Sequence, residues 1–248
     1  MIYLSHTAHC QFLGLIFGVL AWIFILTTTG LNDWRMWTVD DRSVITSGVA
    51  WVGIWKACFF THTLPEFETC QSISISDSFI PAEILAAQVL MVLAVISGFA
   101  GNICAALAMR KAYFSLEDRR NMKQLFLLAG TLYLLTGGLC LVPLVLNMIS
   151  VFNNSTIDFP PELYLPAAPV EQRVGTAIGV GILGSIMMLL SGLLFLCYRY
   201  AWQTLSSEAP TNNRGTHGTR TETTHRSEGQ KGDKQGRDNP AFHREEMS

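Results

Sequence analysis

The chain reads WVGIWKAC over residues 51–58 and carries a further cysteine at Cys70. This stretch lies in a loop between two long apolar segments, and the chain has four such segments in all. A bilayer core about 30 Å thick needs about 20 apolar residues to be crossed by a helix. Four windows meet that requirement without an internal Lys, Arg, Asp or Glu, at about 11–30, 84–109, 124–146 and 174–197.

The four windows predict membrane-spanning helices, because backbone groups inside lipid must pair within their own segment. The first window has an alternative interpretation as a secretory signal peptide. However, no Lys or Arg precedes it, and its apolar run is longer than the usual core of a signal peptide. We therefore expect a mainly α-helical membrane domain over residues 1–200, with loops at about 31–83 and 147–173.

The basic residues predict the side of the membrane on which each loop lies. The short segment 110–123 holds five Lys or Arg residues, whereas loop 31–83 holds three and loop 147–173 holds one. Cytosolic loops are enriched in Lys and Arg. We therefore expect both termini in the cytosol and the two loops with few basic residues outside the cell.

Cysteines and asparagines in these loops are candidates for modification. Cys58 and Cys70 are the two cysteines of the predicted extracellular loops. Paired cysteines in an oxidising compartment are usually bridged, so we expect a disulfide, with two free thiols as the alternative. Residues 153–156 read NNST, in which Asn153 and Asn154 each head an N-glycosylation sequon. Crowding leaves room for a glycan on one of the two.

The first loop shows the alternation that is typical of β-strands. Residues 72–76 read SISIS, a period-two run directly after the second loop cysteine. In an extended segment Trp51, Gly53 and Trp55 lie on one face, so both indoles point the same way. We expect the paired indoles to act either as interfacial anchors or as the core of a small sheet.

These residues resemble the W…GLW…C…C signature of claudins, the four-helix proteins of tight junctions. Ile54 stands where claudins usually have Leu, and the pair at 34–35 resembles the Trp-Arg or Trp-Lys pair after the first claudin helix. Residues 80–91 are similar to the claudin entry into helix two, with Gln88 where claudins typically place Arg. The residues that match the signature are Trp34, Arg35, Trp51, Gly53, Ile54, Trp55, Cys58 and Cys70.

Further downstream, residues 138–143 look like the end of claudin helix three, and Phe159-Pro160 resembles the aromatic-Pro element of the second loop. Gly175, Gly179 and Gly192 suit close packing of the fourth helix, because small residues let membrane helices approach one another.

The resemblance covers about residues 8–200. It implies a left-handed four-helix bundle capped by a small extracellular antiparallel β-sheet that the disulfide staples. It also implies a structural protein of plasma-membrane tight junctions, which polymerises into strands by binding itself and other claudins in cis and in trans. Such strands form a paracellular barrier or an ion-selective pore.

The residues point away from other classes of function. The spans hold no buried carboxylates or His clusters of the kind that mark metal or proton chemistry, so we expect no enzyme activity, cofactor or metal site. Basic residues are not interleaved with aromatic ones, which excludes a nucleic-acid interface. Membrane lipid is the expected surrounding of the helices.

An alternative function lies within the same superfamily. The signature is shared by peripheral-myelin and epithelial-membrane proteins and by auxiliary subunits of glutamate-receptor and calcium channels, so it identifies a fold more surely than a function. The alternative is therefore an auxiliary subunit or organiser of another channel or receptor. The pair at 34–35 and residues 81–91 favour a claudin.

The loop acids and the C-terminal segment carry two further expectations. Glu66, Glu68 and Asp77 are candidate pore-lining acids, and an acidic lining would favour cations. Residues 201–248 are rich in Gly, Thr, Arg, Glu and Asn, and we expect a disordered cytoplasmic tail. Ser248 is a poor ligand for a PDZ groove, which prefers an apolar terminal side chain, so binding to PDZ scaffolds is doubtful.

Overall fold

The computed structural model describes residues 2–40, 45–61, 64–114, 119–159 and 169–207. Four helices in this part of the chain are long and apolar enough to cross a membrane, with mean hydropathies of 2.1 to 2.3 over their apolar spans. The predicted four-helix membrane fold is confirmed. The helices are α1 (Ile2–Gly30), α2 (Ala82–Phe114), α3 (Arg119–Phe152) and α4 (Thr176–Ser207).

The helices differ from the predicted apolar windows at their ends. Most of them continue past the window, because a helix does not stop where its hydrophobic residues stop; α3, for example, reaches Phe152 instead of 146. Two ends do not: α1 ends at Gly30, as predicted, and α4 starts at Thr176 because Val174 is the last residue of a strand. Helix α4 also continues to Ser207, past the predicted start of the tail at 201, and residues 208–248 lie outside the described part.

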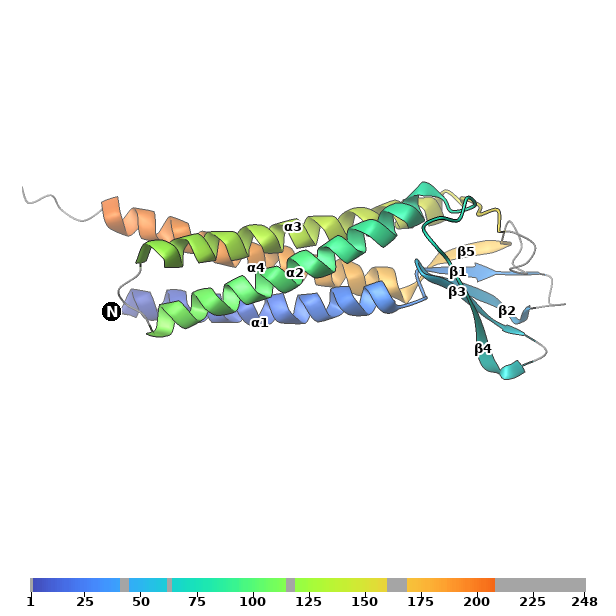
Figure 1. The fold of residues 1–248 in the computed structure, drawn as a ribbon, viewed down its shortest axis with the longest axis horizontal. Helices are drawn as coiled ribbons and strands as arrows, with labels where there is room; N and C mark the ends of the chain where they lie inside the picture. Colours follow the sequence, from blue (N-terminus) through green and yellow to red (C-terminus); the bar gives the residue numbers. More distant parts are fainter. Residues whose placement is uncertain (1, 41–44, 62–63, 115–118, 160–168, 208–248) are drawn as a thin grey trace, which may run out of the picture. The chain divides into compact units, whose positions relative to one another are not determined.

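Five antiparallel strands form one sheet at one end of the four helices (Figure 1). The start of α1, the end of α2 and the start of α3 lie at the opposite end (Figure 1). The strand order is β4-β3-β2-β1-β5. The strands are β1 (Arg35–Thr38), β2 (Ile45–Val52), β3 (Lys56–Thr61), β4 (Leu64–Ser72) and β5 (Glu171–Val174).

Two segments of the sheet region differ from the sequence expectation. Strand β5 comes from the second loop and was not predicted; it extends the sheet by pairing with β1. The expected strand at 72–76 is wrong, because β4 ends at Ser72. A turn follows, in which the Ser74 N–H donates to the Asp77 carboxylate at 2.8 Å. This aspartate turn prevails over the alternating pattern because a short polar side chain can bond the nearby backbone.

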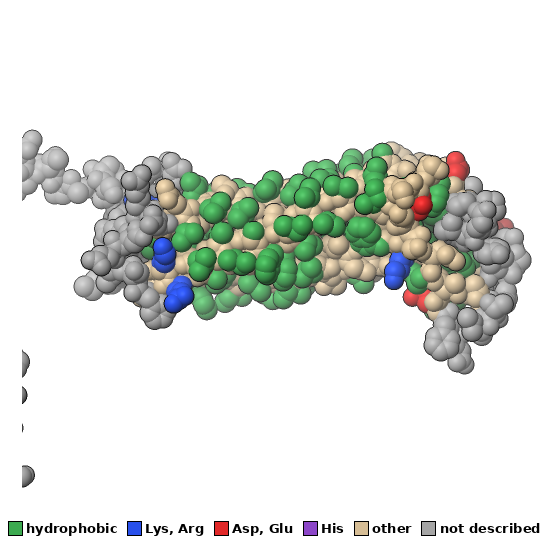
Figure 2. Space-filling view, in the orientation of Figure 1, with side chains coloured by type: hydrophobic (Ala, Val, Ile, Leu, Met, Phe, Trp, Pro, Cys, Tyr) green, Lys and Arg blue, Asp and Glu red, His purple; other side chains and the backbone are tan. Residues whose placement is uncertain are grey.

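The apolar interior is divided between the bundle and the sheet. Along the bundle, hydrophobic side chains cover most of the surface visible in Figure 2, and the charged side chains visible there lie near its two ends. A second core lies under one face of the sheet, where Trp37, Phe59 and Phe159 are buried. Trp37 and Phe159 pack edge to face, with ring centroids 5.4 Å apart. The second loop therefore contributes both a strand and core residues to the sheet.

Glycines allow close helix packing at one of the two predicted positions inside α4. A Cβ added to Gly192 would lie 3.0 Å from the Gly130 carbonyl oxygen, so these two glycines bring α3 and α4 together. A Cβ at Gly179 would meet nothing within 4 Å, so the prediction for Gly179 is wrong. That residue is exposed on the surface of its helix.

Candidate functional site

The predicted disulfide between Cys58 and Cys70 is present. The two cysteines are direct cross-strand partners on β3 and β4, with Cα atoms 4.1 Å apart. The Asn32 side-chain amide, just after α1, donates to Cys58 Sγ at 3.4 Å. The bridge therefore lies at the point where the sheet meets the end of the first helix.

A tight turn at Gly53 brings the sheet against the chain that leaves α1. Gly53 closes the β2–β3 hairpin by donating its N–H to the Lys56 carbonyl at 2.9 Å. A Cβ at this position would lie 2.7 Å from the Asn32 Cα, which is closer than real Cβ contacts come. The signature thus requires glycine here for a close approach between two backbones.

The expected single extended segment that carries Trp51, Gly53 and Trp55 is wrong. Strand β2 ends at Val52, and the turn that follows separates the two indoles. Trp51 packs against Phe60 on the sheet, with centroids 5.8 Å apart. Trp55 instead reaches the helices and donates its indole N–H to the Thr29 carbonyl at 3.0 Å.

Trp34 and Trp55 each bond a carbonyl in the last turn of α1. The final four carbonyls of a helix have no partner within the helix. The indole N–H of Trp34 donates to the Thr28 carbonyl at 3.0 Å, next to the carbonyl that Trp55 occupies. The backbone N–H of Leu31 donates to the Thr27 carbonyl at 2.9 Å. Two tryptophans of the signature therefore cap the first helix and fasten the sheet to it.

Arg35 fastens the other side of the sheet through a buried charge. Its side chain is 1% exposed, and its Nη2 donates to Asn147 Oδ1 at 2.7 Å and to Glu83 Oε1 at 3.3 Å. Ser150 donates to the same Glu83 oxygen at 2.6 Å. The Asn147 amide donates to the Glu83 and Pro143 carbonyls at 3.2 and 2.9 Å. This group, called the arginine cluster below, joins β1 to the facing ends of α2 and α3.

Burial lowers the pKa of Arg35 from its ordinary value, and the Glu83 carboxylate opposes that shift. The Nε and Nη1 groups of Arg35 are buried without a partner among the described residues. An arginine remains charged in proteins because its ordinary pKa lies far above physiological pH. The buried, charged guanidinium of Arg35 is thus held in the arginine cluster by the hydrogen bonds of its Nη2 alone.

Gln88 makes a third attachment, from α2 to both ends of the β3–β4 hairpin. Its side-chain amide donates to the Ile54 carbonyl at 2.6 Å and to the Ile73 carbonyl at 3.3 Å. The side chain is fully buried. A neutral amide at this position therefore bonds the turn that carries the signature.

The second loop is tied to the first through Asp33. Its carboxylate accepts hydrogen bonds from the Thr176 N–H at 2.9 Å and the Thr176 hydroxyl at 2.6 Å, which caps the start of α4. A Cβ at Gly175 would collide with the Asp33 carbonyl oxygen, so the chain needs glycine there. The chain just after the end of α1 is thereby fixed to the start of α4.

Other predicted site residues occupy different positions. Glu68 is exposed on β4, opposite Phe60, whereas Asp77 closes the turn after β4. The side chain of Glu66 lies outside the described residues. Asn153 and Asn154 are exposed at the end of α3. Asn154 has a positive φ of 50°, and its N–H and that of the next residue bond back to Val151 and Ser150. This geometry ends the helix in the manner of a Schellman motif.

The sequence pattern did not single out Glu83, Asn147 and Ser150 as partners of Arg35. A weak signal was present, because Glu83 directly precedes the second apolar window and Asn147 directly follows the third. Polar residues at the ends of spans are common, however, so the signal did not identify which of them meet.

The amino-acid sequence is similar to those of known proteins. A family model described as PMP-22/EMP/MP20/Claudin tight junction matches residues 19–197. Claudin-7 of Mus musculus is 25% identical over 191 residues, which cover 75% of this chain and 84% of that protein. Claudin-4 of Homo sapiens is 25% identical over 192 residues, 75% of this chain and 85% of that protein. Claudin-5 of Homo sapiens is 27% identical over 195 residues, 77% of this chain and 83% of that protein. With four membrane-spanning helices, a stapled sheet and a match over most of its length, the chain belongs to the PMP-22/EMP/MP20/Claudin family of membrane proteins.

Proposed function

We propose that the chain is a structural protein of plasma-membrane tight junctions whose sheet forms part of a paracellular barrier. The sheet lies outside the cell and both termini lie in the cytosol. The five basic residues at 110–123 support this orientation, because they lie in the last turns of α2 and the first turns of α3, at the end of the bundle opposite the sheet (Figure 1). The chain associates in cis and in trans with itself and with other claudins, and it has no enzymatic role.

The face of the sheet that points away from its core supports a barrier. One continuous row of cross-strand partners runs over all five strands on this face. The residues next to this row along each strand, such as Trp37 and Phe59, point into the core on the opposite face. From β5 to β4 the row consists of Arg173, Met36, Trp51, Cys58 and Cys70, and we call it the outer row.

The middle of the outer row is apolar, and its only charged residue is paired. Arg173 Nε lies 2.9 Å from the Glu171 carboxylate. Ion-selective pores are lined by backbone carbonyls or by rings of charged side chains. A methionine, an indole and a disulfide offer neither to a passing ion. This apolar middle favours a barrier over a pore, although the exposed Lys56 and Glu68 flank it on the same face.

A cation pore remains the second candidate, supported by Glu68. This acid is exposed and lies on the same face as Phe60, next to the outer row. Asp77 is a weaker candidate because it closes a turn. In the proposed orientation Asn153 and Asn154 also face the cell exterior, where one of them is available for glycosylation.

Permeability measurements test the barrier. We expect the full-length chain, expressed in a leaky epithelial monolayer, to raise the transepithelial resistance and to lower Na⁺ and Cl⁻ permeability together. Trp51→Glu places a charge in the outer row and should shift the dilution potential towards Na⁺. Ile75→Glu is the matched control, because Ile75 is exposed but lies outside the strands.

Two results would overturn the barrier. An increase in Na⁺ permeability that Glu68→Gln abolishes would establish the cation pore. Unchanged resistance, together with an even distribution over the plasma membrane, would favour an auxiliary subunit of another channel or receptor.

A further inference from the structure

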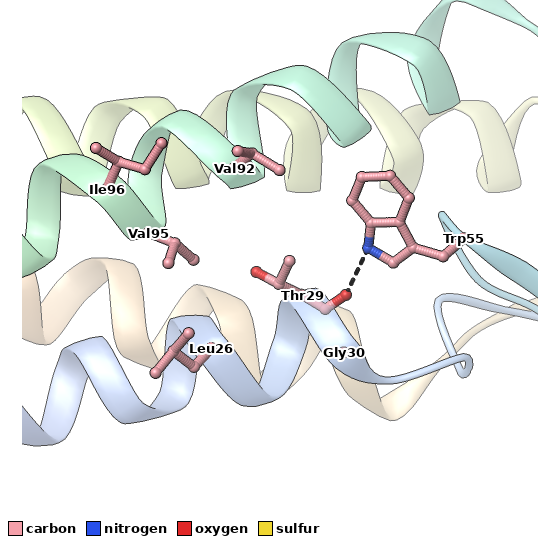
Figure 3. Close-up of a pocket in the computed structure, with 7 residues that line it drawn as sticks. All are labelled: Leu26, Thr29, Gly30, Trp55, Val92, Val95 and Ile96. Atoms are coloured by element: carbon pink, nitrogen blue, oxygen red, sulfur yellow. Dashed lines mark hydrogen bonds between the residues drawn. The ribbon is translucent and has the colours of Figure 1, made fainter. Parts of the chain in front are cut away.

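A groove of about 310 Å³ lies between α1 and α2 at the end of the bundle nearer the sheet (Figure 3). Leu26, Thr29 and Gly30 line it from the first helix. Val92, Val95 and Ile96 line it from the second helix. Its volume falls within the range of roughly 300–1,000 Å³ that is usual for ligand sites.

Two tryptophans set the length of the groove. Away from the sheet, Trp22 donates its indole N–H to the Val95 carbonyl at 3.0 Å. A Cβ at Gly98 would lie 2.7 Å from the Trp22 ring, so the helices are in close contact there. Towards the sheet, the Trp55 indole bounds the end of the groove (Figure 3). Helices α1 and α2 diverge towards the sheet (Figure 1). The groove therefore starts on the sheet side of Trp22 and ends at Trp55.

The polar side-chain groups that line the groove are already bonded. The Trp55 N–H donates to the Thr29 carbonyl at 3.0 Å, and the Thr29 hydroxyl donates to the Ile25 carbonyl at 2.7 Å. An occupant that brings a hydroxyl or a charge would therefore find no free donor among these side chains. The lining fits hydrocarbon.

The groove also opens onto the lipid-facing surface of the spans. Leu26, Val92 and Ile96 are 37%, 41% and 60% exposed, and they lie within two of the apolar spans. The occupant therefore reaches the groove from the bilayer, which supplies hydrocarbon chains along the whole of these spans.

From these observations we propose that the groove binds one acyl chain of a membrane phospholipid, which packs against Trp55. Because Trp55 belongs to the turn that fastens the sheet to α1, the bound chain supports that attachment from the membrane side. The site selects for hydrocarbon and not for a headgroup. The proposal does not depend on barrier function, since it concerns lipid contact and not permeability.

Gly30 offers a variant that places a side chain in the groove at a position where an added Cβ is free of contacts. A Cβ at this position meets nothing within 4 Å, and Gly30 lies one helical turn from Leu26 on the same face of α1. Gly30→Leu therefore puts an apolar side chain where the lipid would lie. Gly179→Leu is the matched control, because Gly179 is equally free of neighbours but lies on α4, away from the residues that line the groove.

The experiment uses phosphatidylcholine with a diazirine in its acyl chain, reconstituted in nanodiscs with the full-length protein. After illumination, mass spectrometry locates the lipid adducts along the chain. We expect adducts at 92–96 to exceed those at the exposed Leu190 and Leu193 of α4. They should fall by more than half in Gly30→Leu and stay unchanged in Gly179→Leu.

Three results would overturn the proposal. Equal labelling of α2 and α4 in the unmodified protein would show ordinary surrounding lipid, whatever the folding of the variants. Undiminished adducts in a folded Gly30→Leu variant would place the lipid elsewhere. Cross-linking of Ile96→Cys into dimers in the same nanodiscs would show that a second copy covers the groove.

Discussion

The sheet is fastened to the helices in two chemically different ways. On one side, the buried charge of Arg35 bonds to Glu83 and Asn147 on α2 and α3. On the other side, the neutral indoles of Trp34 and Trp55 bond to carbonyls at the end of α1. Removing one partner of a buried ion pair leaves the other charge unpaired, which costs more than leaving a neutral carbonyl without its donor. Substituting one residue should therefore lower the free energy of unfolding more at the first attachment than at the second.

The largest effect is expected for Arg35→Met. This change leaves Glu83 with Ser150 but without its positive partner, and it should lower the free energy of unfolding by about 3 kcal/mol. Unfolding of the purified protein in detergent micelles measures it. The double variant Arg35→Met/Glu83→Met should recover part of the loss, because no uncompensated charge remains. A double variant that is as unstable as the sum of both single variants would show that the charges do not act as a pair.

A smaller effect is expected for Gly53→Ala, which tests the approach of the turn to α1. The added Cβ would lie 2.7 Å from the backbone of Asn32, so the two segments must move apart at a cost of about 2 kcal/mol. Thermal unfolding in micelles measures this loss. Gly179→Ala, where the Cβ meets nothing within 4 Å, should leave stability unchanged or raise it by about 0.5 kcal/mol. Equal losses in both variants would contradict a specific role for the turn.

The smallest effect is expected for Trp55→Phe, which keeps an aromatic ring but removes the N–H that bonds Thr29. The free energy of unfolding should fall by about 1 kcal/mol, the net value of one hydrogen bond. Trp51→Phe on the outer row serves as the comparison, with an expected change of about 0.5 kcal/mol or less. A larger loss for Trp51→Phe than for Trp55→Phe would reverse the roles assigned to the two indoles.

The features that depend on local composition could be predicted from the sequence. The four spans follow from runs of apolar residues, and the disulfide follows from two cysteines in one loop between spans. Bulk hydrophobicity over 20 residues is a strong signal because each residue of the run contributes to it. The helix ends are less certain, since they depend on caps such as Asp33 at the start of α4.

The features that depend on distant partners could not be predicted. Arg35, Glu83 and Asn147 come from three separate parts of the chain, and the sequence does not show that they meet. Strand β5 has four residues and pairs with β1 from another loop, so local alternation gives little sign of it. The face of Trp55 was predicted wrongly because a period-two rule holds only within one strand, and a turn begins at Gly53.

Freeze-fracture electron microscopy of junction-free fibroblasts that express the full-length tagged chain tests the central claim most directly. If the chain is a tight-junction protein, the fracture faces should show continuous strands at contacts between two expressing cells, and cells beside non-expressing neighbours should lack them. Particles spread evenly over the plasma membrane, with no strands at contacts, would contradict a strand-forming junction protein.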